Sequence, residues 1–278
     1  MRRLLSALPH SRASAFWLFS LVAFGLLCLP AFASVTVGTL TLEREARLGE
    51  TYQGTVTMTN NDDAPQDVVI YQTDYSFASD GSNQYNKPGT LTRSNAPWIT
   101  FSPRQAQIPP HQSSQISYVV HVPADSALVG TYWSMIMVEE VPPPLADSVL
   151  QLARNETSVR QVMRYGVQCI TQIGESGLTK VNVTGARLEE LENHQKELQV
   201  DVENTGQRWI VPAAWMELYD TEGRHVGRFE SQKKRIFPGT SVRFHIALAG
   251  SFTGRYKALV VLDNGDQSVF GAKYNLEF

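Results

Sequence analysis

Cysteine is nearly absent from this sequence of 278 residues, which contains only Cys28 and Cys169. Cys28 lies in a segment that we expect to be removed, so the remaining chain cannot form an intramolecular disulfide and depends on its hydrophobic core for stability. Net charge is also small, with a formal value of −3 and a pI near 6.1. A chain so close to neutrality has no electrostatic basis for binding nucleic acid or an anionic membrane. We therefore expect no nucleic-acid partner.

Motifs for catalysis and metal binding are lacking as well. Five histidines beyond residue 33 are scattered, without the i, i+2 or i, i+4 spacing of metal sites: His111, His121, His194, His225 and His245. No G-x-S-x-G motif, Cys-His signature or phosphate-binding glycine loop occurs. The acidic segments 80–83 and 263–266 lack the full register of a calcium loop and are interpreted as turns. We expect no catalytic residue, no metal and no cofactor.

Long apolar runs are confined to the beginning of the chain. Residues 15–29 are apolar apart from Ser20, follow several arginines and end near the small-residue sequence AFA at 31–33. This pattern predicts a secretory signal peptide over residues 1–33, cleaved after Ala33; the arginine pair near the start also allows a twin-arginine signal, but the general secretory route is favoured. Leu27 occupies the position where a lipobox needs a small residue, so we expect no lipid anchor. No later run reaches membrane length, which predicts a periplasmic or secreted protein without an integral membrane segment.

The rest of the sequence has the pattern of an all-β protein. Apolar and polar residues alternate in short runs bounded by Gly, Pro, Asn and Asp. In the first half this alternation predicts strands near 35–42, 51–60, 66–77, 97–102, 113–122, 131–141 and 158–173. A Pro-rich segment after Val141 predicts a long connection, with one or two helical turns, before the last of these strands.

The two halves of the mature chain repeat each other. VTMTN at 56–60 matches VDVEN at 200–204, because both are alternating strands that end on Asn. Ile108 and two prolines lead into one alternating strand, and Ile236-Phe237-Pro238 leads into another. Each of these is followed by a Gly-x-Tyr strand start, at Gly130 and Gly254. This order predicts two tandem immunoglobulin-like β-sandwich domains, over 34–175 and 176–278.

These segments resemble a known family. WITFSP at 98–103, the Ile108-Pro109-Pro110 turn and the alternating strand after it are similar to the N-terminal domain of periplasmic pilus chaperones, which have two immunoglobulin-like domains. The segment VGTYW at 129–133 departs from that family and looks more like the WxL-interacting cell-wall proteins, which normally add a C-terminal membrane helix. Both resemblances imply a binding or assembly role.

The resemblance to pilus chaperones also implies a binding site. In that family the strand corresponding to 157–173 lends its edge to an incomplete subunit, and a basic residue beside it binds the subunit's C-terminal carboxylate. Arg160 and Arg164 stand where a comparable pair occurs, and Arg44 could contribute from the neighbouring edge. Alternation predicts that Cys169 and its same-face neighbours point at the core. The apolar side chains left for a partner are then chiefly Val162 and Ile170.

Two functions remain open from the sequence. The first is a non-catalytic periplasmic chaperone or assembly factor that binds a secreted or surface subunit, such as a pilus subunit, through an edge strand. The alternative is a structural or adhesive cell-envelope protein that binds protein or glycan through its loops.

Overall fold

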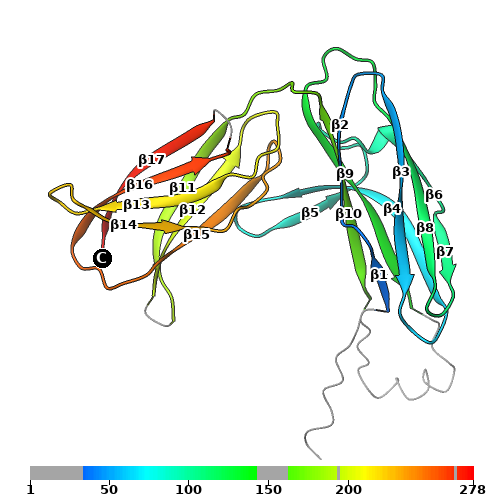
Figure 1. Ribbon diagram of the computed structural model, residues 1–278, viewed down its shortest axis with the longest axis horizontal. Coiled ribbons are helices and arrows are strands. Elements are labelled where there is room, and N and C mark those ends of the chain that lie inside the picture. Colours follow the sequence, from blue (N-terminus) through cyan, green and yellow to red (C-terminus); the bar gives the residue numbers. More distant parts are fainter. Residues whose placement is uncertain (1–33, 143–161, 193–194, 266–267) are drawn as a thin grey trace, which may run out of the picture. The chain divides into compact units, whose positions relative to one another are not determined.

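The computed structural model describes residues 34–142, 162–192, 195–265 and 268–278 (Figure 1). Val35 to Phe278 belong to one compact unit. The predicted signal peptide, nearly all of the predicted Pro-rich connection and Arg160 lie outside the described residues. Within the described ranges, no helix is long and apolar enough to cross a membrane.

The first ten strands form two sheets that face each other across one core. One sheet has the order β1 (Val35–Val37), β3 (Thr51–Asn60), β8 (Ser113–His121) and β6 (Ile99–Ser102). The other has the order β2 (Thr41–Ala46), β10 (Arg164–Ile173), β9 (Gly130–Val141), β4 (Gln66–Phe77) and β5 (Asn83–Asn86), with β7 (Gln105–Ile108) also pairing with β4. A short 3₁₀ helix, Ala96–Trp98, precedes β6. Inward-facing residues of both sheets, such as Met58, Ile116 and Ile136, are fully buried in the shared core.

The remaining seven strands repeat this arrangement. One sheet has the order β11 (Val181–Glu190), β12 (Lys196–Asn204) and β15 (Ser241–Leu248). The facing sheet has the order β14 (His225–Glu230), β13 (Ala213–Tyr219), β16 (Arg255–Asp263) and β17 (Val269–Glu277). Phe244, Met216 and Val260 meet in the second core. Two antiparallel sheets packed face to face around alternating apolar residues make a β-sandwich. The predicted fold class, all-β with two tandem immunoglobulin-like sandwiches, is confirmed.

For most of the predicted strands of the first half, each end that the structure describes lies within two residues of the end of an observed strand. One prediction is wrong. The segment 35–42 is not a single strand, because β1 pairs with β3 in one sheet and β2 pairs with β10 in the other. The short strands β5 and β7 were not predicted: β5 carries no alternating apolar residues, and the alternation in β7, where Ala106 and Ile108 alternate with glutamines, covers only four residues.

Candidate functional site

The chain changes sheets between β1 and β2. The backbone N–H of Gly38 still donates to the carbonyl of Thr57 on β3, at 2.9 Å. Two residues later, the carbonyl of Leu40 accepts from the backbone N–H of Gln168 on β10, also at 2.9 Å. From Thr41 onward β2 runs parallel to β10, opposite Gln168 to Ile173. The first part of β10 therefore has no partner in β2.

This sheet change leaves an open edge at residues 164–167 of β10. These four residues pair with β9 on one side, and no strand pairs with their other side within the described residues. Met163 accepts a hydrogen bond from Glu140 of β9, and Gln168 donates toward β2. Because main-chain groups alternate in direction along an antiparallel strand, the N–H and C=O groups of Arg164 and Gly166 point to the open side. We call residues 164–167 the open edge; it is about 13 Å long.

The inward side chains of β10 belong to the core of the first sandwich. Val167 and Cys169 are buried in this core, and Tyr165 packs against it. Cys169 is 4% exposed, which confirms the prediction that it faces the core. Burial raises the pKa of its thiol to about 12, so the thiolate is disfavoured at neutral pH. β10 is therefore anchored by one face while its open edge stays available.

The outward face of the open edge carries a charged cluster. Arg164 Nε donates to Glu139 Oε2 at 2.7 Å, and the hydroxyl of Tyr71 donates to the same oxygen at 2.7 Å. The hydrogen bonds from Arg164 and then Tyr71 lower the pKa of Glu139. Desolvation, followed by the hydrogen bond to Glu139, raises the pKa of Tyr71 to about 12. Arg164 is thus held by an intramolecular carboxylate.

Two methionines of β9 lie beside Gly166. A Cβ atom added to Gly166 would stand 2.7 Å from the Cε of Met135 and 3.3 Å from the sulfur of Met137. Thioether side chains therefore fill the space that a side chain at this position would take. Both methionines are buried, so they pack beside Gly166 without adding exposed apolar surface to the open edge.

Apolar residues are exposed just before the open edge. Val162 and Val141 each have an exposed fraction of 40%. Extension of the β9–β10 register places Val162 opposite Val141. The predicted exposure of Val162 is confirmed, and it forms a small apolar surface together with a residue that the sequence did not single out.

Arg44 and Arg164, the two predicted basic residues that the structure describes, do not come together. Arg44 lies opposite Thr171, seven residues from Arg164 along β10, or about 23 Å. It contacts Glu50 at 3.7 Å and lies over the ring of Tyr52. Arg44 therefore stands beside the paired end of β10, away from the open edge.

The prediction that Ile170 is exposed to a partner is wrong. Its side chain is 1% exposed and packs in a second cluster with Trp133 and Phe237, whose rings stack with centroids 4.7 Å apart. Alternation correctly places Ile170 on the outward face of β10, but it cannot show that another part of the chain covers that face.

Sequence reasoning missed several neighbours of the open edge. Glu139 and Tyr71 lie on strands other than β10, and Gly166 has no side chain to attract notice. Within the described residues, no group of three or more His, Cys, Asp or Glu side chains could hold a metal ion. The arrangement offers main-chain hydrogen-bonding groups and flanking side chains, which suits strand addition.

Comparison with known proteins identifies similar folds only. No model of a known protein family matches the chain, and no curated protein matches it. Three of the similar solved structures are the class 5 fimbriae chaperone CfaA, the SafA pilin in complex with the SafB chaperone from Salmonella enterica, and the CsuC–CsuE chaperone–tip adhesion subunit pre-assembly complex from Acinetobacter baumannii. CfaA is 12% identical, with a TM-score of 0.44, and the match covers 87% of this chain and 98% of that chain. The SafB match is 17% identical, with a TM-score of 0.41, covering 88% and 97%. The Csu match is 16% identical, with a TM-score of 0.45, covering 86% and 98%.

Similarities of this size do not by themselves establish a function, which has to come from the open edge itself.

Proposed function

We propose that this protein is an exported, non-catalytic chaperone or assembly factor. It binds a secreted or surface subunit, such as a pilus subunit, by pairing an extended segment of that subunit with the open edge. The periplasm is the compartment in which such a partner would be met.

The main support for this proposal is the unpaired edge of β10. β2 begins to pair with β10 only at Gln168, so the strand keeps an unpaired edge at residues 164–167 within the described part of the chain. Unpaired edges are normally shielded, because they recruit other strands. An edge that is anchored on its core side by Tyr165 and Val167, yet unpaired, is suited to accept a partner strand.

The size of the edge limits how much it can contribute. The N–H and C=O groups of Arg164 and Gly166 would add up to four hydrogen bonds, worth about 0.5–1.5 kcal/mol each, or about 2–6 kcal/mol together. A dissociation constant of 1 mM corresponds to about 4 kcal/mol, so main-chain pairing alone gives weak binding. Side-chain contacts must supply the rest, and Val162, two residues before Arg164, offers an exposed apolar side chain beside the edge.

Arg164, together with Arg160, remains our candidate for binding a partner carboxylate. Arg164 already donates to Glu139, so a partner carboxylate has to share or replace that contact. This competition favours a partner group that approaches from the open side while Glu139 stays in place. Arg44 is too far along β10 to join the same contact.

The test is site-specific photo-crosslinking in the native envelope. A photoreactive residue is placed at position 164 and, as a matched control, at position 187, where Arg187 is similarly exposed on β11. We expect position 164 to crosslink a secreted subunit and position 187 not to do so. Crosslinks that come from loop positions such as Asp125 or Glu222, with none from position 164, would instead support adhesion through the loops.

Substitutions then separate main-chain from side-chain contributions. Arg164→Pro removes the N–H that faces the open side, whereas Arg164→Ala removes only the side chain. Val162→Asp puts a charge beside the edge, and Val226→Asp puts one on an equally exposed valine of β14 as its control. We expect Arg164→Pro and Val162→Asp to abolish crosslinking from a reporter at position 141, Arg164→Ala to weaken it, and Val226→Asp to leave it unchanged.

A further inference from the structure

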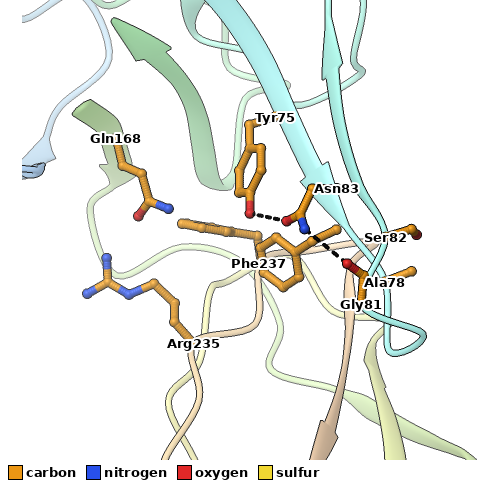
Figure 2. Close-up of a pocket in the computed structure, with 9 residues that line it drawn as sticks. Tyr75, Ala78, Gly81, Ser82, Asn83, Gln168, Arg235 and Phe237 are labelled. Carbon is orange, nitrogen blue, oxygen red and sulfur yellow. Dashed lines mark hydrogen bonds between the residues drawn. The ribbon is translucent and has the colours of Figure 1, made fainter. Parts of the chain in front are cut away.

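A cavity lies at the paired end of the open edge. It has a volume of about 270 Å³ and is lined by residues of β4, the β4–β5 turn, the start of β5, β10 and the segment before β15. Figure 2 shows Gln168 and Arg235 on one side of it, with Tyr75 and Asn83 on the other. Its size is below the 300–1,000 Å³ that is typical of pockets for drug-sized ligands or cofactors, so it fits a single side chain better than a cofactor.

Aromatic rings form much of the cavity wall. The ring centroids of Tyr75 and Phe77 are 5.6 Å apart, and those of Phe77 and Phe237 are 6.2 Å apart in an edge-to-face arrangement. Aromatic pairs favour centroid separations of 4.5–7 Å with tilted or offset rings. A further ring inside the cavity would continue this packing.

Most polar groups at the cavity already have partners. The amide oxygen of Asn83 accepts from the Tyr75 hydroxyl at 2.6 Å, and its amide nitrogen donates to the carbonyl of Gly81. Arg235 pairs with Glu43 at 3.1 Å, and its guanidinium group lies 4.4 Å from the ring centroid of Trp209.

The side-chain amide of Gln168 is different. It has no hydrogen-bond partner within the described residues, and it points toward the cavity (Figure 2). The cavity therefore combines apolar rings with one amide that is free to meet the edge or the polar tip of an occupant.

The position of Gln168 links the cavity to the open edge. Gln168 follows Gly166 by two residues, so its side chain lies on the same outward face of β10 as Arg164 and Gly166. Its main-chain N–H is the first that bonds to the β1–β2 segment, at Leu40. A partner strand that pairs with residues 164–167 must end at Gln168, because the β1–β2 segment occupies the edge from that residue onward. The last outward side chain of the partner strand then lies at the mouth of the cavity.

We propose that this cavity receives an aromatic side chain from the partner strand. The inference rests on the proposed function and identifies the side chain that anchors the partner. It also accounts for the contacts needed beyond main-chain pairing, because an aromatic residue buried in a pocket is a typical dominant contact of an interface.

The test uses a displayed library of short random peptides, selected on the full mature chain and on variants. Gln168→Trp fills the cavity from β10, and Ser82→Trp fills it from the exposed β4–β5 turn, which keeps the test valid if one variant folds poorly. Gln168→Ala leaves the cavity open and serves as the matched control. Arg164→Pro blocks the open edge. Melting curves verify that each variant is folded.

We expect peptides selected on the wild-type chain to combine alternating apolar residues with an aromatic residue at one fixed position. Gln168→Ala should retain this preference, whereas either tryptophan variant should remove it and weaken the aromatic peptides by about tenfold or more. Two results would overturn the cavity assignment and leave the proposed function standing. In the first, peptides depend on the open edge but show no preference for an aromatic residue. In the second, the aromatic preference persists in both tryptophan variants. Binders that are all insensitive to Arg164→Pro would overturn both.

Discussion

Asn60 and Asn204 share three matching side-chain hydrogen bonds in the two sandwiches, and Asn60 makes one more, to the carbonyl of Pro109. Each is fully buried at the end of its strand. Each side-chain amide nitrogen donates to the carbonyl four residues later and to the carbonyl of an isoleucine, Ile108 or Ile236. Each side-chain oxygen accepts from the backbone N–H two residues later. Each asparagine therefore ties the end of a strand to the turn before another strand.

The first prediction is that Asn60→Ala and Asn204→Ala destabilise the protein separately. Either change leaves buried carbonyls without a donor, at a cost of about 1–3 kcal/mol. Chemical denaturation followed by near-UV circular dichroism should show Asn60→Ala shifting only the transition of the first sandwich, and Asn204→Ala only that of the second. Asn61→Ala, on the exposed neighbour, is the control. A loss of stability as small as that of the control would contradict the shared role of the two asparagines.

The duplication could be predicted from the sequence because each repeated feature is a short, continuous segment. The VTMTN and VDVEN segments, the turns that follow them and the isoleucines that receive their hydrogen bonds all stand at matching places in the chain. Strand bounds could be predicted for the same reason, since alternation and turn residues lie within a few positions of each other.

The candidate site could be predicted only in part, because it depends on contacts between distant segments. The alternation over 35–42 does not show where the chain leaves β3 for β10, although this change creates the open edge. The pairing of Arg164 with Glu139 depends on the β9–β10 register. The burial of Ile170 depends on Phe237, which comes from the second half of the chain.

The second prediction is that the Cys169 thiol reacts slowly in the native mature chain. Burial limits access, and its raised pKa keeps it protonated at neutral pH. Titration with Ellman's reagent should show little reaction before denaturant is added and full reaction afterwards. Cys169→Ala with Val226→Cys, a thiol at an exposed site, is the reactive control. Fast native reaction, or a disulfide-linked dimer on a non-reducing gel, would show that Cys169 is not held in the core.

The third prediction is that the two sandwiches fold when expressed separately, as residues 34–175 and 177–278. Each has its own buried core, and within the described residues neither depends on a disulfide. Separation exposes Trp133 and Phe237, which stack against each other in the full chain, so each half should be less stable than in the intact protein. Each should still give a cooperative thermal transition. A half that binds hydrophobic dyes and melts without cooperativity would place the domain boundary elsewhere.

The fourth prediction concerns the pH dependence of the cluster at the open edge. Hydrogen bonds from Arg164 and Tyr71 lower the pKa of Glu139, so the folded state favours its ionised form. A carboxyl group with a lowered pKa stabilises the fold above its ordinary value, about 4.3 for Glu, and this contribution is lost as the pH falls through the folded-state pKa. Glu139→Gln should therefore cost about 1 kcal/mol near neutral pH, since the pair is partly exposed. The cost should shrink as the pH falls below about 4.

Melting temperatures of the wild type and Glu139→Gln between neutral pH and pH 3 provide the measurement. Glu230→Gln, in an exposed ion pair with Arg228, is the control. A difference that stays constant across this range would mean that the charge of Glu139 contributes nothing to stability.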